Sequence, residues 1–140
     1  MEKSIKKNEV KTQTTKGKPQ AVQSICVIGL GYVGLPLAAA FGRTHHKVSG
    51  FDISTEKVDA LKKNIDLNQE LSEDELKSTQ VEYSDDPKVI EQADIIIAAI
   101  PTPIDNAKKP DLSPIISASK TIGQHMKEGV IVVYESTVYP

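Results

Sequence analysis

Three glycines and one aspartate form the pattern in this 140-residue sequence that points most directly to chemistry. Gly29, Gly31 and Gly34 make a Gly-x-Gly-x-x-Gly motif directly after the apolar run 25–28, and Asp52 follows the last glycine by 18 residues. A glycine-rich turn that opens a helix offers free backbone N–H groups to a diphosphate. An acidic residue about 20 residues later accepts hydrogen bonds from a ribose. Together these residues predict a dinucleotide site.

The three glycines meet three different needs of such a site. Gly29 permits the tight turn from strand to helix, Gly31 lets a pyrophosphate approach the backbone, and Gly34 lets the helix pack closely on the sheet. The Asp52 carboxylate would repel a 2′-phosphate, which favours NAD over NADP as the cofactor. The alternative is an α/β domain that binds no nucleotide.

Neighbouring residues extend the candidate site. Tyr32 and Val33 lie between the glycines and are predicted to contact the cofactor with them. Lys57 follows Asp52 by about one helical turn. Its ammonium group either leans toward the adenosine or stays in solvent on a helix, and the sequence leaves both interpretations open.

Two later strand ends supply the remaining candidates. Pro101 and Thr102 follow the strongest strand signal, at 94–100, and the Thr102 hydroxyl either approaches the cofactor or caps its own loop. Ser136 and Thr137 end the last apolar run, near the expected position of the nicotinamide. Glu135 beside them either belongs to this site or is a solvated carboxylate at a strand end.

The elements that position these residues follow from hydrophobic patterning. Short apolar runs predict five buried parallel strands, at 24–28, 47–51, 81–83, 94–100 and 130–133. Helical patterns lie between them, at 33–43, 54–65, 72–79, 86–92 and 113–126. Alternating strands and helices predict an α/β fold with right-handed crossovers. We expect a Rossmann-type doubly wound parallel sheet of five strands in the order 3-2-1-4-5.

Local sequence signals predict which face of a helix packs against the sheet and where each helix starts. The expected inner face of the first helix consists of Val33, Leu37, Ala40 and Phe41. That of the second consists of Val58, Leu61 and Ile65. The expected N-caps are Ser54, Ser72, Asp86 and Ser113.

The expected strand order places the candidate residues together. The first and fourth strands are neighbours whose crossovers run to opposite sides, and ligands occupy the crevice at their carboxyl ends. The glycine turn and the 101–103 turn must therefore face each other across the cofactor.

Other reactive residues are poor candidates. Cys26 lies inside an apolar strand, where a thiol is usually an inert core residue rather than a nucleophile. His45 and His46 fall in the turn at the opposite end of the sheet, and Asp85-Asp86 is better explained by helix capping. No residue spacing predicts a metal site.

Composition excludes other classes of protein. With 39 % hydrophobic and 26 % charged residues the chain is typical of a soluble globular protein, and no apolar run is long enough to span a membrane. A cytoplasmic location is the default. Residues 1–22 form a basic, polar stretch that we expect to be a disordered extension. Because residues 1–23 hold six lysines and two glutamates, the remainder is acidic, which argues against nucleic acid.

Four segments resemble the N-terminal NAD-binding domain of the UDP-glucose/GDP-mannose dehydrogenase family. They are Gly29–Ala38, Gly50–Ile53, Ile100–Pro103 and Glu135–Pro140, in order, within a match that spans residues 24–140. Ile104-Asp105 and Tyr139-Pro140 resemble the branch of the family that acts on UDP-N-acetylhexosamines.

The resemblance implies a reaction as well as a fold. In this family a sugar C6 alcohol is oxidised to a carboxylate, two NAD⁺ are reduced in turn, and a cysteine carries a thioester between the two steps. The threonine matching Thr102 contacts NAD, and the one matching Thr137 helps to hold an active-site water. The family's catalytic cysteine, lysine and asparagine lie beyond the matched region, and Cys26 does not correspond to that cysteine.

Three hypotheses follow. In the first, residues 23–140 are the NAD-binding domain of a UDP-sugar 6-dehydrogenase, truncated before its central helix and substrate domain. Such a fragment would bind NAD weakly, turn over no UDP-sugar, lack the homodimer expected of the full-length family, and expose an apolar patch at strand five and on helix faces. The second is a free-standing regulatory module that works only with a partner chain. The third is another NAD enzyme, such as a hydroxyacid dehydrogenase.

Overall fold

The computed structural model describes residues 21, 23–44 and 47–135 of the chain. The basic extension expected at 1–22, His45 and His46, and the candidate residues Ser136 and Thr137 therefore lie wholly or almost wholly outside the described residues.

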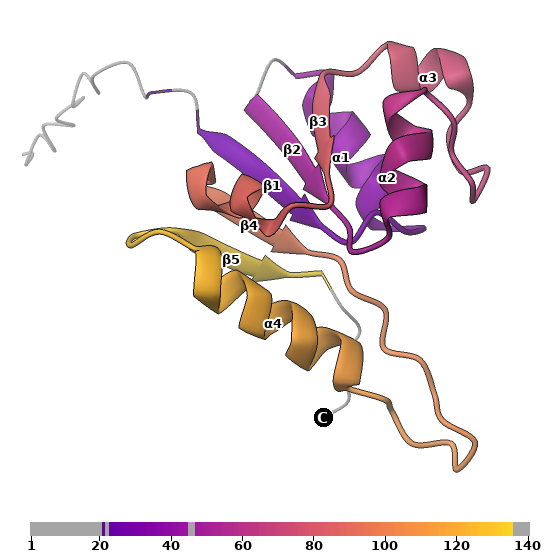
Figure 1. Ribbon diagram of the computed structural model, residues 1–140, viewed down its shortest axis with the longest axis vertical. Coiled ribbons are helices and arrows are strands. Elements are labelled where there is room, and N and C mark those ends of the chain that lie inside the picture. Colours follow the sequence, from indigo (N-terminus) through magenta and orange to yellow (C-terminus); the bar gives the residue numbers. More distant parts are fainter. Residues whose placement is uncertain (1–20, 22, 45–46, 136–140) are drawn as a thin grey trace, which may run out of the picture.

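Five parallel strands form one sheet in the order β3-β2-β1-β4-β5, which confirms the predicted topology. The strands are β1 (Ser24–Ile28), β2 (Lys47–Phe51), β3 (Val81–Ser84), β4 (Ile95–Ala98) and β5 (Ile131–Tyr134). The helices are α1 (Gly34–Gly42), α2 (Thr55–Lys62), α3 (Glu73–Lys77), the 3₁₀ helix η1 (Pro87–Gln92) and α4 (Ser113–His125). Figure 1 shows β5 and α4 at one edge of the molecule and α2 and α3 near the other.

Two hydrophobic clusters cover the two faces of the sheet. One joins β1 and β4 to α1, α2 and α3, and includes Val27 and Leu35. The other joins the same strands to η1 and α4, and includes Cys26 and Ile122. Successive residues of a strand point to opposite faces, so an apolar run such as 25–28 supplies both clusters.

The buried face of α1 differs from the predicted one. The buried residues are Gly34, Leu35, Ala38, Ala39 and Gly42. Of the residues predicted to face inward, Val33 and Ala40 are exposed, and Leu37 and Phe41 are only half-buried. The prediction was wrong because α1 is apolar on every side, so hydrophobicity alone does not identify its inner face.

The second and third helices follow their sequence signals more closely. Val58 and Leu61 are buried as predicted, and Ser54 caps α2 by accepting a hydrogen bond from the Lys57 N–H. Ser72 forms the predicted capping box with Glu75. Ile65 was placed wrongly: it follows the end of α2 and is 52 % exposed.

Two further boundaries differ from expectation. Asp86 caps η1 as predicted, but this six-residue segment is a 3₁₀ helix, a form used mainly for short pieces. The expected N-cap Ser113 lies inside α4, because its hydroxyl donates to Asp111 Oδ1 (2.6 Å) instead of accepting from the helix. None of the helices in the described part of the chain is long and apolar enough to cross a membrane.

Candidate functional site

The glycine turn follows β1 directly and is held between β2 and β4. The Gly29 N–H donates to the Phe51 carbonyl oxygen (2.8 Å), and the Ala99 N–H donates to the Ile28 carbonyl oxygen (2.8 Å). Gly29 has φ +88°, a backbone conformation that L side chains rarely adopt. A Cβ atom there would also lie 2.7 Å from the Ala99 carbonyl oxygen, so the turn itself requires this glycine.

Gly34 and Gly31 are glycines for different reasons. A Cβ atom on Gly34 would overlap the carbonyl oxygen of Gly29, so the first turn of α1 could not lie as close to β1 with any other residue. A Cβ atom on Gly31 would meet no protein atom within 4 Å. Packing therefore explains Gly34 but not Gly31. The bare backbone at Gly31 fits a diphosphate that approaches from outside the protein.

Asp52 lies at the end of β2 and is buried. Its Oδ2 accepts from the Leu30 N–H (2.9 Å) inside the glycine turn, and its Oδ1 accepts from the Ser54 N–H (3.0 Å). The carboxylate therefore joins the ends of β1 and β2 and stands beside the motif that it was predicted to accompany.

Lys57 contacts this carboxylate rather than extending into solvent. Its Nζ lies 3.0 Å from Asp52 Oδ2, and its side chain is 24 % exposed. A carboxylate accepts about four hydrogen bonds, and three are made here by protein groups. One acceptor position remains on Asp52 for a ribose hydroxyl, while the Lys57 ammonium has further N–H groups to donate.

A cavity of about 410 Å³ opens between this carboxylate and α4. Its floor is the glycine turn and the strand ends, and its wall includes the residues Ile53, Pro114, Ser117, Ala118 and Thr121. The space is mostly apolar with a few polar groups, which suits a flat heterocycle attached to a ribose.

A smaller cavity of about 180 Å³ lies on the other side of the glycine turn. It is lined by Tyr32, Val33, Thr102 and Glu135, among others. The two cavities share the lining residues Gly31, Ala99, Ile100 and Pro101. A two-part ligand with its centre at Gly31 would therefore fill both spaces, as a dinucleotide does.

The structure thus brings most of the predicted site residues together. Gly29, Gly31, Asp52, Lys57 and the 101–102 turn line two cavities that share lining residues, whereas Gly34 lines neither. Glu135 lines the smaller cavity, whereas Ser136 and Thr137 lie outside the described residues.

The α4 wall was missed by sequence reasoning. Pro114, Ser117, Ala118 and Thr121 line the larger cavity at the i, i+3, i+4, i+7 spacing of one helix face. The signal was present in the sequence, since a helix that follows the fourth strand starts near the carboxyl ends of the strands. Ile53 was also missed, although it follows Asp52 directly.

The remaining reactive residues lie elsewhere. Burial raises the pKa of the Cys26 thiol to about 11, so the thiol stays protonated and inert near neutral pH. Asp85 accepts from the Thr55 hydroxyl (2.8 Å), a hydrogen bond that holds its pKa below the usual range. No group of three possible metal ligands occurs among residues 23–44 and 47–135.

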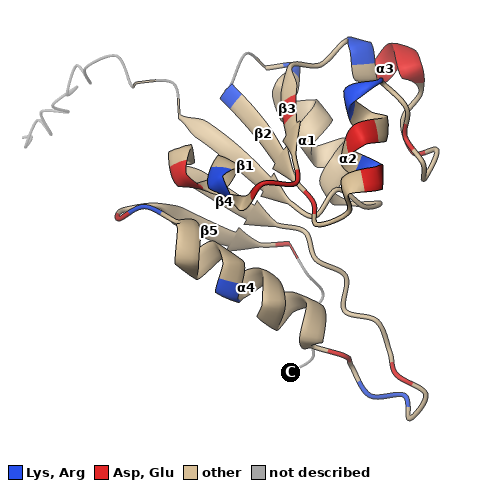
Figure 2. Cartoon of the chain, viewed as in Figure 1, with Lys and Arg blue, Asp and Glu red and all other residues tan. Residues whose placement is uncertain are grey.

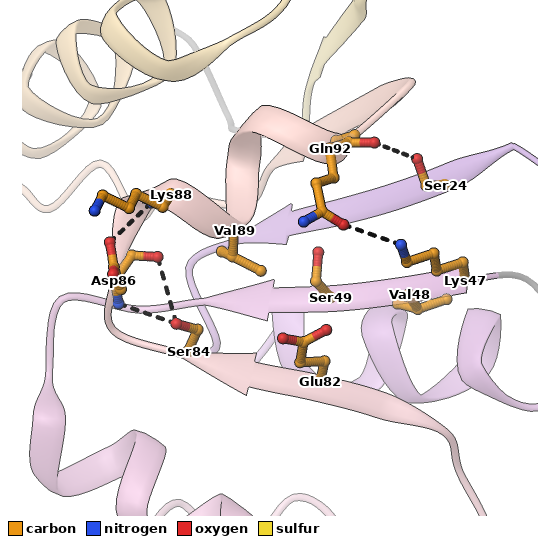
Figure 3. Close-up of a pocket in the computed structure, with 11 residues that line it drawn as sticks. Ser24, Lys47, Val48, Ser49, Glu82, Ser84, Asp86, Lys88, Val89 and Gln92 are labelled. Carbon is orange, nitrogen blue, oxygen red and sulfur yellow. Dashed lines mark hydrogen bonds between the residues drawn. The ribbon is translucent and has the colours of Figure 1, made fainter.

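A separate hollow of about 260 Å³ lies on the η1 side of β2 and β3 and shares no residue with the site (Figure 3). Several of its polar side chains bond to their neighbours. Lys47 Nζ donates to Gln92 Oε1 (3.0 Å), and the Ser24 hydroxyl donates to the Gln92 carbonyl oxygen (2.6 Å). Nothing in this arrangement converges on a ligand.

Comparison with known proteins gives a consistent result. Residues 23–140 match the model of the UDP-glucose/GDP-mannose dehydrogenase family, NAD binding domain. The protein CapL of Staphylococcus aureus is 51 % identical over 118 residues, covering 84 % of this chain and 28 % of CapL. A UDP-N-acetyl-D-glucosamine 6-dehydrogenase of Salmonella typhi is 45 % identical over 117 residues, covering 83 % of this chain and 27 % of that protein.

Solved structures show the same relation. A GDP-mannose dehydrogenase of Pseudomonas aeruginosa, in a ternary complex, superposes with a TM-score of 0.77 at 28 % identity, over 83 % of this chain and 29 % of that one. An NDP-N-acetyl-D-galactosaminuronic acid dehydrogenase of Methanosarcina mazei superposes with a TM-score of 0.74 at 31 % identity, over 85 % of this chain and 28 % of that one. The chain therefore spans little more than a quarter of the length of these relatives.

Proposed function

Because the chain belongs to the UDP-glucose/GDP-mannose dehydrogenase family, as its NAD-binding domain, we propose that it holds the NAD of a nucleotide-sugar 6-dehydrogenase. The observation that carries this proposal is the pair of cavities that meet at Gly31. Protein packing does not require a glycine at this position, whereas a diphosphate lying against the backbone does. NAD supplies the hydride acceptor of the reaction, and this chain supplies the surface that orients it.

The proposed roles follow the two cavities. The backbone of Gly29, Gly31 and Gly34 meets the diphosphate at the start of α1, where the helix dipole favours a negative charge. Asp52 and Lys57 hold the adenosine ribose, one as acceptor and the other as donor. These contacts fix the cofactor without taking part in bond making.

The nicotinamide half belongs to the smaller cavity. Tyr32 and Val33 line it, together with Pro101 and Thr102. Ser136 and Thr137 are proposed to complete this half, with Thr137 holding a water in the reaction. This part of the assignment rests on the resemblance of the Glu135–Pro140 segment to the family.

The proposed substrate is a UDP-N-acetylhexosamine, whose C6 alcohol becomes a carboxylate. Support comes from relatives named as UDP-N-acetyl-D-glucosamine 6-dehydrogenases at 45 % and 44 % identity. The substrate-binding and catalytic parts belong to the portion of the relatives that this chain does not match, so residues 1–140 alone should bind NAD without turnover. Homodimerisation through that further portion and a cytoplasmic location complete the proposal.

Calorimetric titration with NAD tests the cofactor site. We expect Asp52→Ala to weaken NAD binding by about 1 to 3 kcal/mol, the usual range for hydrogen bonds to a charged group. Lys57→Met, which leaves the Leu30 and Ser54 contacts of Asp52 in place, should also weaken it. Asp59→Ala on the exposed side of α2 serves as the control.

Two results would contradict the cofactor assignment. One is unchanged NAD affinity in both site variants, and the other is equal affinity of the wild-type chain for NADP. A folded chain that gives no heat with NAD at millimolar concentration would reject NAD binding altogether.

A further inference from the structure

Helix α4 presents a nearly uncharged wall to the larger cavity. Lys120 is the one Lys, Arg, Asp or Glu in this helix, and it does not line the cavity (Figure 2). Pro114 and Ala118 make the wall apolar, whereas Ser117 and Thr121 add one hydroxyl group each. Because a phosphate would find no counter-charge on this wall, the wall suits the neutral base of a nucleotide.

The Thr121 hydroxyl offers this cavity an acceptor and not a donor. Thr121 Oγ1 donates its hydrogen to the Ser117 carbonyl oxygen (3.2 Å), one turn earlier in α4. A threonine in a helix has few side-chain rotamers, and this hydrogen bond fixes one of them. Since a hydroxyl has one hydrogen and two lone pairs, the half-buried Thr121 side chain can only accept from a ligand.

The second hydroxyl of the wall is adjustable. Ser117 is exposed, and its hydroxyl can turn so that it either donates to a ligand or accepts from it. Side chains at i and i+4 lie on the same face of a helix, with Cβ atoms about 5 to 6 Å apart. The wall therefore presents an adjustable hydroxyl at Ser117 beside a fixed acceptor at Thr121.

The other lining residues leave this part of the cavity to the base of the cofactor. Gly31 and Asp52 line the same space of about 410 Å³ as Thr121. With the diphosphate at Gly31 and the ribose at Asp52, the base is what remains to occupy the space toward α4. Apolar lining residues such as Ile53 and Ala118 suit a flat aromatic ring.

Purine bases differ at the edge that such a pair of hydroxyls would meet. Adenine carries an amino group at C6, which is a hydrogen-bond donor, beside the ring acceptor N7. Guanine and hypoxanthine carry a carbonyl oxygen at C6 instead, which is an acceptor. A fixed acceptor pairs with the amino group, but it would set a lone pair against the carbonyl oxygen. Ser117 can adjust to either base, so the discrimination falls to Thr121.

We propose that Thr121 recognises the base of the cofactor, with its Oγ1 accepting a hydrogen bond from the C6 amino group of adenine. Thr121 thereby selects adenine dinucleotides over those that carry hypoxanthine or guanine. This inference rests on the proposed function, because it takes Asp52 as the residue that holds the adenosine ribose.

Calorimetric titration of the 140-residue chain with NAD and with nicotinamide hypoxanthine dinucleotide tests the proposal. We expect the wild-type chain to bind the hypoxanthine form about three- to tenfold more weakly, the range expected for one hydrogen bond. Thr121→Val removes the hydroxyl and should weaken NAD binding by a similar factor, without weakening the binding of the hypoxanthine form. Thr121→Ser keeps the hydroxyl and should still bind NAD more tightly.

Ser119→Ala is the matched control. The Ser119 hydroxyl donates to the Ile115 carbonyl oxygen (2.7 Å), which is the same kind of bond within α4, but Ser119 lines neither cavity of the site. This variant should keep the wild-type preference for NAD. Circular dichroism checks that all the variants fold.

The outcomes separate this inference from the proposed function. A wild-type chain that binds both dinucleotides equally well overturns the inference and leaves NAD binding intact. A Thr121→Val variant that keeps the preference, or that loses affinity equally for both forms, also overturns it. A folded wild-type chain that binds neither dinucleotide contradicts the proposed function, and the inference then falls with it.

Discussion

At the scale of single residues, neighbouring glycines of one motif have different causes. Gly34 is fixed by contact with Gly29, whereas nothing in the protein contacts the space beside Gly31. The sequence motif alone does not reveal this difference, because all three positions hold the same residue. The structure separates a glycine kept for folding from one kept for a ligand.

This separation gives a paired prediction. Gly31→Ala should leave the thermal unfolding temperature within about a degree of wild type but weaken NAD binding at least tenfold, because its methyl group enters the diphosphate space. Gly34→Ala should destabilise the chain by several kcal/mol, as severe overpacking does. Thermal denaturation and calorimetry measure the two effects. A Gly31→Ala variant with wild-type NAD affinity would place the diphosphate elsewhere.

At the same scale, the candidate site could be predicted only in part. The glycines, Asp52 and the 101–102 turn follow from motifs with a fixed local geometry. The contact of Lys57 with Asp52 depends on a side-chain rotamer, which the sequence leaves open. Ile53 was missed because an exposed isoleucine after a strand has no pattern that distinguishes it.

At the scale of elements, Asp94 connects three parts of the fold. Its Oδ2 accepts from the Ser24 N–H (2.8 Å) at the start of β1, and its Oδ1 lies 2.6 Å from Lys127 Nζ after α4. The Lys127 ammonium and the Ser24 hydrogen bonds lower the pKa of Asp94 to about 2. Asp94 therefore holds β1, β4 and the α4–β5 turn together in its ionised form.

The direction of the pH effect follows from the lowered pKa. The folded state binds the Asp94 proton less readily than the unfolded state, so the stabilisation is complete above about pH 4 and is lost as the pH falls toward 2. In urea unfolding, Asp94→Asn should be less stable than wild type at pH 6, and the difference should shrink below pH 4. Asp59→Asn is the control. A difference that is constant from pH 6 to pH 3 would reject this role.

The start of a helix was predictable where the expected N-cap side chain accepts a hydrogen bond from an N–H group of that helix. Ser54 and Ser72 accept hydrogen bonds from N–H groups of their own helices, as their sequence context predicts. Ser113 does not, because Asp111 lies two residues earlier and accepts its hydroxyl hydrogen. The inner face of α1 was mispredicted because burial on that helix is decided by the sheet and by the close contact at Gly34.

At the scale of the whole molecule, the strand order was predicted correctly because the chain alternates strands and helices with few other topologies available. The role of α4 as a wall of the larger cavity depends on where a crossover helix lands over the sheet. Such tertiary placement follows from the topology, not from any local pattern.

Because NAD binds the folded domain, it should raise the temperature at which the domain unfolds. NAD at 100 times its dissociation constant should add about 2.7 kcal/mol of stability, and a domain of this size should then unfold on the order of 10 °C higher. NADP at the same concentration should give a clearly smaller shift, since Asp52 would face its 2′-phosphate. Differential scanning fluorimetry measures both. Equal shifts with the two cofactors would contradict the assigned specificity.

The hydrogen bond from Leu30 to Asp52 has a consequence for how such a domain can diverge. The carboxylate that selects the ribose also fastens the loop that follows β1, so replacing it changes affinity and folding at once. A single substitution at this position that shifts the preference from NAD to NADP should therefore also lower the stability of the domain. A second substitution that satisfies the Leu30 amide must come first, which makes cofactor preference slow to drift in evolution and hard to redesign one residue at a time.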